Sequence, residues 1–178
     1  AWVRLGGAQV SAATAADADA ALRQAFEEPV AAYYGSQRIL LRPQNIGFHV
    51  DTAAMLAAAQ QADTVVNLVR YLAEDALHRP PKTVEIPLKY TLDSAALDAW
   101  LQDVATEHDR PPQPPRPLVA TLSLAPGQPG QALDLVASRS QLLATLITAR
   151  ERTVHLAVAE TPAPPINIAA LGELLKAR

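Results

Sequence analysis

The sequence predicts an α+β fold, because helical and strand-like segments alternate along the chain while hairpins and proline-rich connectors interrupt the alternation. The stretch "VAAYYGSQRILLRP" (30–43) is typical of two strands joined by a tight turn at Gly35-Ser36. The stretch "DSAALDAWLQDVATEHD" (93–109) places apolar residues at the spacing of one helix face. A Pro-x-x-x-Gly-x-x-x-Asp pattern occurs twice before a helical segment, which predicts an internally repeated strand–turn–helix device.

The first half of the chain contains three further predicted elements besides the hairpin. A threonine, Thr14, is placed to cap the first helix, and Pro29 ends it because proline has no N–H to continue the pattern. The elements are a strand at 2–5 followed by a turn at Gly6-Gly7, a helix at 14–28, and a helix at 51–77 that is broken near residues 62–63.

The second half contains strands and helices of similar length. In the helix at 93–109, Leu97, Trp100, Leu101 and Val104 form the apolar face that we expect to enter the core. The other elements are a strand at 83–92 with an edge-type Pro87, a stiff polyproline connector at 110–117, a strand at 118–124, a helix at 135–149, a strand at 153–159 and a last helix from 168. A boundary near "HRPPK" (78–82) divides the chain into two similar α+β subdomains, 1–80 and 81–178.

The repeated pattern is explained by turn and cap chemistry. Proline ends a strand, glycine supplies a positive φ, and aspartate accepts hydrogen bonds from the first N–H groups of a helix. His49 in the first copy corresponds to Ala132 in the second, so the histidine is interpreted as a turn residue and not as chemistry. The structural residues of the two copies are Pro43, Gly47 and Asp51, and Pro126, Gly130 and Asp134.

Composition excludes several classes of protein. The chain has 178 residues, 49% of them hydrophobic and 19% charged, with a formal net charge of −3, so it can form a core and lacks the basic surface that nucleic acid requires. It has no cysteine and no apolar run long enough for a transmembrane helix or a signal peptide. Because it starts at Ala1 without a methionine, we expect it to be a piece of a longer protein that includes upstream sequence.

The chain carries no recognisable catalytic motif. No serine is followed three residues later by lysine, and none lies in a Gly-x-Ser-x-Gly elbow. The four histidines do not have the spacing of metal ligands, and "EHD" (107–109) is interpreted as a solvated helix end. No glycine-rich phosphate loop is present. We therefore expect no enzymatic activity, no metal and no cofactor.

The residues Gly6, Gly7, Thr14, Pro43, Gly47 and Asp51 fit the pattern of a known family. With them, "VRLGGAQVSAATAADADAAL" and "YYGSQRILLRPQNIGFHVDTAAMLAAA" resemble the peptidoglycan-binding domain of VanW-type proteins, which also precedes the catalytic domain of some L,D-transpeptidases. The family usually has a second glycine before the threonine, where this chain reads "AQVSAAT". The second half, with "HDRPP" (108–112) and "PGQPGQALD" (126–134), resembles the domain that precedes exported serine hydrolases of the penicillin-binding and β-lactamase type.

The resemblance implies an accessory domain of an exported bacterial protein, located outside the cell or in the envelope, with peptidoglycan as partner and a catalytic domain downstream. The alternative is a spacer or pre-catalytic module with no ligand of its own. If a ligand binds, aromatic and guanidinium side chains suit a carboxylated stem peptide. The candidate binding residues are Tyr33, Tyr34, Arg38 and Arg42, which lie on the two strands of the predicted hairpin.

Overall fold

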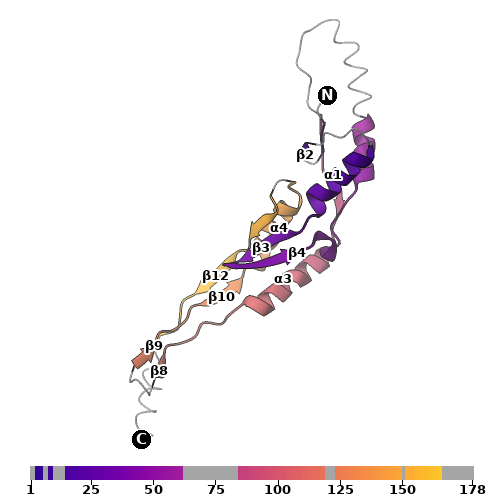
Figure 1. Cartoon of the computed structure of the whole chain (residues 1–178). Coiled ribbons are helices and arrows are strands. Elements are labelled where there is room, and N and C mark those ends of the chain that lie inside the picture. The colour runs from indigo at the N-terminus through magenta and orange to yellow at the C-terminus, as the bar shows by residue number, and fades with distance from the viewer. Residues whose placement is uncertain are drawn as a thin grey trace.

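The computed structural model describes residues 3–5, 8–9, 15–61, 84–118, 123–149 and 151–165. Within them the fold is α+β, as the sequence predicts. Figure 1 shows an elongated molecule in which α1 lies towards one end, a small sheet, α3 and α4 form the middle, and a narrow two-stranded arm extends at the other end. Thr14, the turn at 6–7, residues 62–77 and the helix expected from 168 lie outside the described residues.

The helices lie close to their predicted positions, except for a short 3-10 helix that is not predicted. They are α1 (Ala15–Glu27), the short 3-10 helix η1 (Pro43–Ile46), a helical segment over residues 52–61, α3 (Ser94–His108) and α4 (Leu135–Leu146). In α3, the predicted apolar residues Leu97, Leu101 and Val104 are buried, and Trp100 packs half-buried against the same core.

The strands are short and form several small sheets. They are β1 (Val3–Leu5), β2 (Ala8–Gln9), β3 (Val30–Tyr34), β4 (Gln37–Leu41), β5 (His49–Val50), β6 (Val84–Ile86), β7 (Tyr90–Thr91), β8 (Arg116–Leu118), β9 (Ser123–Ala125), β10 (Gly130–Leu133), β11 (Thr153–His155) and β12 (Val158–Thr161). The single strand expected at 83–92 is interrupted at Pro87, and its two parts, β6 and β7, join different sheets.

The central sheet has the strand order β11-β3-β4. β3 and β4 form the predicted antiparallel hairpin, with Gly35 in the turn at φ 58°, and β11 adds to β3 in parallel from the far end of the sequence. One face of this sheet is buried against α3 and α4 side chains. That face carries Val30, Ala32, Tyr34, Leu41 and Val154.

Strand pairing connects the two predicted subdomains. β1 pairs with β6, β5 with β7, and β3 with β11, so each of these pairs joins a strand before residue 80 to one after it. One buried cluster likewise contains Phe26 and Phe48 from the first stretch and Leu101 and Leu142 from the second. The two stretches are therefore interleaved, and the predicted boundary at 78–82 falls outside the described residues.

Helix α1 is attached to the sheet by a half-buried arginine. The Arg152 guanidinium donates to the Ala25 carbonyl near the end of α1 and lies 5.8 Å from the centre of the Phe26 ring. A cation at this position stabilises the negative end of a helix. Burial lowers the pKa of Arg152 below its ordinary value, although an arginine remains charged at neutral pH.

An aspartate caps each of three helices at the point where a short strand ends. Asp51 Oδ1 accepts from the Ala54 N–H at 2.9 Å, and Asp134 Oδ1 accepts from the Ala137 N–H at 2.9 Å. Asp93 does the same for α3, with Ala95 and Ala96 N–H groups at 2.9 and 3.1 Å. The third copy was not predicted, because no proline and glycine precede Asp93 at the repeat spacing.

The proline and glycine of the two predicted copies have different roles. Pro43 starts η1, and Gly47 ends it in the left-handed conformation with φ 62°. Gly130 is instead part of a strand, and its φ is not in the left-handed region, so the predicted positive φ at Gly130 is wrong. Only the strand end and the aspartate cap are repeated, and Pro126 precedes a strand where Pro43 begins a turn of helix.

The arm consists of a proline-rich chain, residues 110–118, and the chain that pairs with it, residues 123–131. Its first three backbone pairs recur every three residues. Arg110 pairs with Gln131, Gln113 with Gln128, and Arg116 with Ala125, all in one continuous antiparallel register. The four backbone hydrogen bonds at the first two pairs measure 2.8 to 2.9 Å. An ordinary antiparallel ladder makes its hydrogen-bonded pairs at every second residue. Here the intervening prolines have no N–H, and polyproline geometry repeats every three residues.

The arm corrects two expectations from the sequence. The polyproline stretch 110–117 is extended as predicted, but it is paired along its length and is not a free connector. The single strand expected at 118–124 is wrong, since Leu118 pairs with Ser123 across the hairpin β8–β9. Glycines on the facing chain make the close approach possible. A Cβ atom on Gly130 would lie 2.5 Å from Pro112 Cδ, and one on Gly127 would lie 2.9 Å from Pro115 Cδ.

We expect Gly130→Ala to lower the free energy of unfolding by roughly 1–3 kcal/mol, the usual cost of overpacking. The added methyl group would meet the rigid ring and backbone nitrogen of Pro112, at 2.5 and 2.7 Å, which cannot rotate away. Urea denaturation measures the change. Gln128→Ala is the control, because its side chain is exposed and its backbone bonds are kept, and it should change stability by less than about 0.5 kcal/mol. Equal stability of Gly130→Ala and wild type would contradict the close packing of the two chains.

We expect Asp93→Ala to destabilise the protein by roughly 0.5–2 kcal/mol, because it removes the acceptor for two N–H groups of α3. Asp93→Asn should keep most of the stability, since an amide oxygen is also a good cap. Asp103→Ala removes an equal charge from the exposed side of the same helix and serves as the control. If Asp103→Ala costs as much as Asp93→Ala in chemical denaturation, charge and not capping is responsible.

Candidate ligand-binding face

The exposed face of the central sheet brings together side chains from three strands. Tyr33 pairs in register with Arg38 on β4 and with His155 on β11. Registered residues on neighbouring strands point to the same face, so Arg38, Tyr33 and His155 form a row across the sheet. The Tyr33 and His155 rings are stacked, with centroids 5.1 Å apart and planes inclined at 23°. Tyr33 is half-buried in this row, whereas Arg38 and His155 are exposed.

Arg42 lies on the same face as Arg38. Side chains alternate along a strand, and Arg42, one residue beyond β4, keeps an extended backbone with φ −89° and ψ 121°. Arg38, Leu40 and Arg42 therefore share one face, and Leu40 is 58% exposed between the two arginines. Neither arginine makes an ion pair with any described residue. Both guanidinium groups are thus available to an anion from solution.

Tyr34, the fourth predicted ligand-binding residue, lies on the opposite face of the sheet. Its side chain is only 4% exposed, and its hydroxyl donates to Asp109 Oδ1 at 2.9 Å. His155, which no motif of the sequence singles out, completes the row with Tyr33. Because side chains alternate along a strand, two adjacent tyrosines must point to opposite faces of the sheet, and this distinguishes Tyr33 from Tyr34. Nothing in the sequence near His155 indicates that its strand pairs in parallel with the strand of Tyr33.

The row can supply three kinds of contact. The Tyr33 ring offers a stacking surface, and the guanidinium of Arg38 can bind a carboxylate through two parallel N–H groups. The His155 ring supports Tyr33 and adds a donor or an acceptor at its exposed edge. The arrangement therefore offers stacking, ion-pairing and hydrogen-bonding contacts to a ligand.

Asp109 joins the sheet, α3 and the arm. Its Oδ1 atom accepts from the Tyr34 hydroxyl and from the Leu133 N–H, both at 2.9 Å. The His108 ring packs against Tyr34, with centroids 5.5 Å apart. The expectation that "EHD" is a helix end is correct, but Asp109 is bonded and not merely solvated. Burial, and then the hydrogen bond and charge of Asp109, raise the pKa of Tyr34 to about 12.

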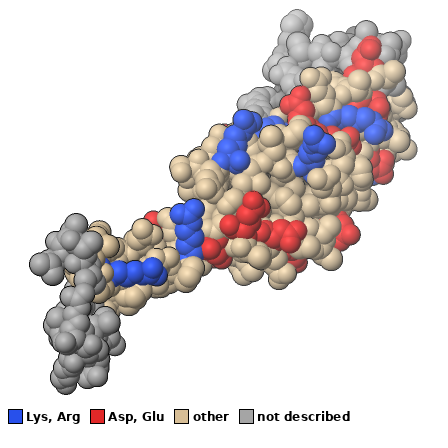
Figure 2. All heavy atoms as spheres, turned by 60° about the horizontal axis from the view of Figure 1, so that its bottom comes forward, with Lys and Arg blue, Asp and Glu red and all other residues tan. Residues whose placement is uncertain are grey.

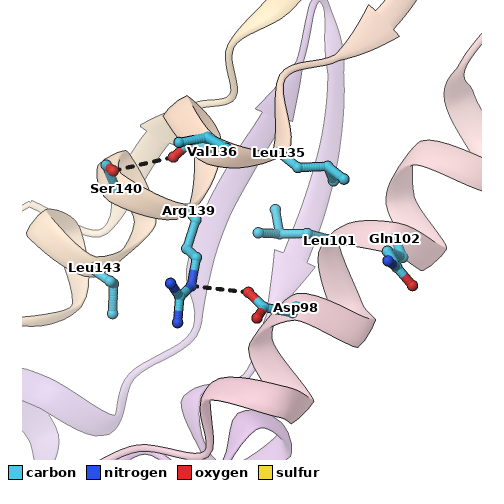
Figure 3. Close-up of a pocket in the computed structure, with 8 residues that line it drawn as sticks. All are labelled: Asp98, Leu101, Gln102, Leu135, Val136, Arg139, Ser140 and Leu143. Atoms are coloured by element: carbon cyan, nitrogen blue, oxygen red, sulfur yellow. Dashed lines mark hydrogen bonds and ion pairs between the residues drawn. The ribbon is translucent and has the colours of Figure 1, made fainter.

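A concave surface lies between α3 and α4 and has a volume of about 360 Å³. Figure 3 shows the Arg139 and Asp98 side chains meeting across it, with Leu101, Leu135 and Leu143 around them. Arg139 Nε lies 2.9 Å from Asp98 Oδ1, which is an ion pair without good hydrogen-bond alignment. Because the pair spans the groove and both charges are already matched, this surface is a weaker candidate than the sheet face.

The remaining polar candidates have structural explanations. His49 lies on β5, exposed, with Nδ1 3.8 Å from Glu27 Oε1, which is beyond hydrogen-bond distance. Thr52 is buried, but its hydroxyl bonds Asp19 on α1, and the Arg23 side chain bonds both. Arg23 also lowers the pKa of Asp19 below its ordinary value. Among the described residues, no cluster of His, Cys, Asp or Glu has the arrangement of a metal site.

No described helix is both long and apolar enough to cross a membrane. Comparison of the sequence with protein-family models gives no match, and comparisons with curated proteins and with solved structures find no significant similarity. The geometry of the sheet face is therefore the main basis for a functional argument.

We expect stability to fall as the pH rises from about 10 to 12, because Tyr34 must ionise in a buried site. The pKa of Tyr34 in the folded protein, about 12, is above its ordinary value of 10.0, so this contribution is complete below pH 10 and is lost as pH rises through 12. Two units correspond to about 2–3 kcal/mol in the free energy of unfolding.

The measurement is urea denaturation from neutral pH to pH 12 for the wild type and Tyr34→Phe. At neutral pH, Tyr34→Phe should cost ~1 kcal/mol for the lost hydrogen bond, and it should reduce the alkaline loss. Tyr90→Phe, at a 42% exposed position, is the matched control and should keep that loss. An unchanged alkaline loss in Tyr34→Phe would contradict the assignment.

Proposed function

We propose that this chain is a non-catalytic accessory domain of an exported bacterial cell-envelope protein, and that it binds peptidoglycan through the exposed face of β11-β3-β4. The resemblance of its turn and cap motifs to the domain of VanW-type proteins supports the envelope context. The row formed by Arg38, Tyr33 and His155 is the observation that carries the proposal.

The chemistry of the row matches the chemistry of muropeptides. Stem peptides carry carboxylates, which the free guanidinium groups of Arg38 and Arg42 can bind in two-pronged geometry. Tyr33, whose ring stacks on His155, offers an apolar surface to a sugar ring or a peptide side chain. Figure 2 shows acidic and basic side chains interspersed over the body of the molecule, so recognition would depend on these local contacts and not on a field of one sign.

The absence of catalysis is part of the proposal and rests on the sequence. An L,D-transpeptidase uses a nucleophilic cysteine, which this chain lacks, and a β-lactamase-type enzyme uses Ser-x-x-Lys, which it also lacks. In a longer protein, such a reaction would belong to a separate domain.

The second candidate function is a spacer that holds a downstream hydrolase or transpeptidase at a distance. The arm favours it, because a ribbon rich in proline and paired along its length is stiff. Figure 1 shows the arm extending away from the body of the domain, as a spacer would require. The two functions share a fold and differ in whether the sheet face binds a ligand.

The test is cosedimentation of the purified chain with insoluble peptidoglycan, followed by NMR titration with soluble muropeptides. We expect Tyr33→Ala/Arg38→Ala to weaken binding by about tenfold or more, since losing one charge-assisted contact costs roughly 1.5–3 kcal/mol. Amide shifts should be confined to β3, β4 and β11. Arg116→Ala, which removes an exposed arginine from the arm, is the matched control and should bind like the wild type.

No cosedimentation of the wild type, together with no shifts at millimolar muropeptide, would leave the spacer as the better account. Retained binding in the double variant would show that another surface is responsible. The double variant must also give the NMR spectrum of a folded protein. We expect it to fold, because Arg38 is exposed and Tyr33 is only half-buried.

A further inference from the structure

The proline-rich chain of the arm presents three distinct edges. Extended proline segments repeat every three residues, so positions three apart lie on the same edge. Arg110, Gln113 and Arg116 lie on the edge whose backbone pairs with the facing chain. The two remaining edges consist of prolines and differ in exposure.

One proline edge is packed and the other is exposed. Pro112 and Pro115 are half-buried, and they face the glycines Gly130 and Gly127 of the paired chain. The other edge contains Pro111, Pro114 and Pro117, and all three are exposed. We call these three residues the proline ridge. It has the P-x-x-P spacing twice in succession, on a backbone that is already fixed in the extended conformation.

Between residues 110 and 133 the two chains of the arm carry charge of only one sign. Between Asp109 and Asp134 the sequence contains no aspartate or glutamate, while Arg110 and Arg116 lie next to ridge prolines. Both arginines are exposed and make no ion pair with a described residue. The view in Figure 2 shows basic side chains on the narrow arm at the lower left. A partner that covers the ridge would therefore need acidic groups at the edge of its binding surface.

We propose that the proline ridge is a docking site for a protein domain with an aromatic-lined groove and an acidic rim. Grooves of this kind accept P-x-x-P segments by packing two prolines between aromatic rings. A free proline-rich peptide still loses conformational entropy when it binds, whereas this chain is held in place by backbone bonds at Arg110 and Gln113. The arm thus presents a preorganised form of a ligand that usually occurs in flexible segments.

The chemistry of the ridge argues against other occupants. Prolines offer no N–H groups to the hydroxyls of a glycan, and two arginines are too few for a phosphate backbone. The ridge is separate from the sheet face, since it lies on the arm, so the docking site does not depend on the proposed peptidoglycan function.

The experiment titrates the full chain with an SH3 domain that has an acidic rim, used as a probe for aromatic-lined grooves. Calorimetry measures affinity, and NMR follows the amides of Arg110, Gln113 and Arg116, which carry the N–H groups of the proline-rich chain. We expect saturable binding, with shifts at these amides and none at Tyr33 or Arg38. Pro111→Ala/Pro114→Ala should weaken binding at least tenfold, and Arg116→Glu should weaken it while leaving every proline in place.

Pro126→Ala/Pro129→Ala is the matched control, because it removes two exposed prolines of the same spacing from the facing chain, which contains no arginine between residues 123 and 134. Its affinity should stay within twofold of the wild type. The proposal is overturned by absence of binding at millimolar probe, by shifts on the sheet face, or by equal losses in the two double variants. Shifts of the arm on concentrating the chain alone would assign the ridge to a second copy and would also overturn it.

Discussion

The carboxylate of Asp109 is the contact on which the arrangement of this domain depends. It lies where α3 ends and the arm begins, and its Oδ1 atom holds both the Tyr34 hydroxyl and the Leu133 N–H at 2.9 Å. The Asp109 carboxylate therefore holds the last residue of β3 and the last residue of β10 beside the point where the proline-rich chain begins. Hydrogen bonds to a charged acceptor are among the stronger ones in proteins, and low exposure at Tyr34 strengthens them further.

The direction of the arm follows from this junction. Immediately after Asp109, Arg110 pairs with Gln131, and the register then continues in steps of three to the hairpin. Proline determines this step, because it removes the N–H groups that an ordinary ladder would use and leaves one donor in every three residues. Glycine on the facing chain completes the arrangement, since Pro112 occupies the space where a Cβ of Gly130 would be. The prolines of one chain can therefore pack closely because the other chain has glycines at the facing positions.

Local patterns predicted the parts of the fold that depend on local interactions. The hairpin at Gly35, helix α3 with its buried Leu97, and the caps at Asp51 and Asp134 all follow from spacing within about fifteen residues. The cap at Asp93 is not predicted by the repeat, because no proline and glycine precede it at that spacing and the cap itself does not need them. An apolar run does not reveal its pairing partner. The sequence therefore predicts single strands at 83–92, where the chain changes sheets, and at 118–124, where it turns.

The candidate site likewise depends on strand pairing that the local sequence does not reveal. Strand alternation assigns Tyr33 and Tyr34 to opposite faces, but it does not say which face is buried. That depends on β11, which pairs in parallel with β3 at a sequence separation of 122 residues (Thr153 with Ala31) and contributes His155 to the exposed row.

The two adjacent tyrosines consequently have complementary roles. Tyr34 is anchored to Asp109 beneath the sheet, and this contact holds the end of β3. Because the backbone there is fixed, Tyr33 must project from the other face, where it stacks on His155 beside Arg38. The carboxylate of Asp109, which accepts from Leu133 at the start of the arm, therefore also holds the strand end from which Tyr33 projects. A ligand on the sheet and a partner on the arm would contact surfaces that the Asp109 junction holds in a fixed relation.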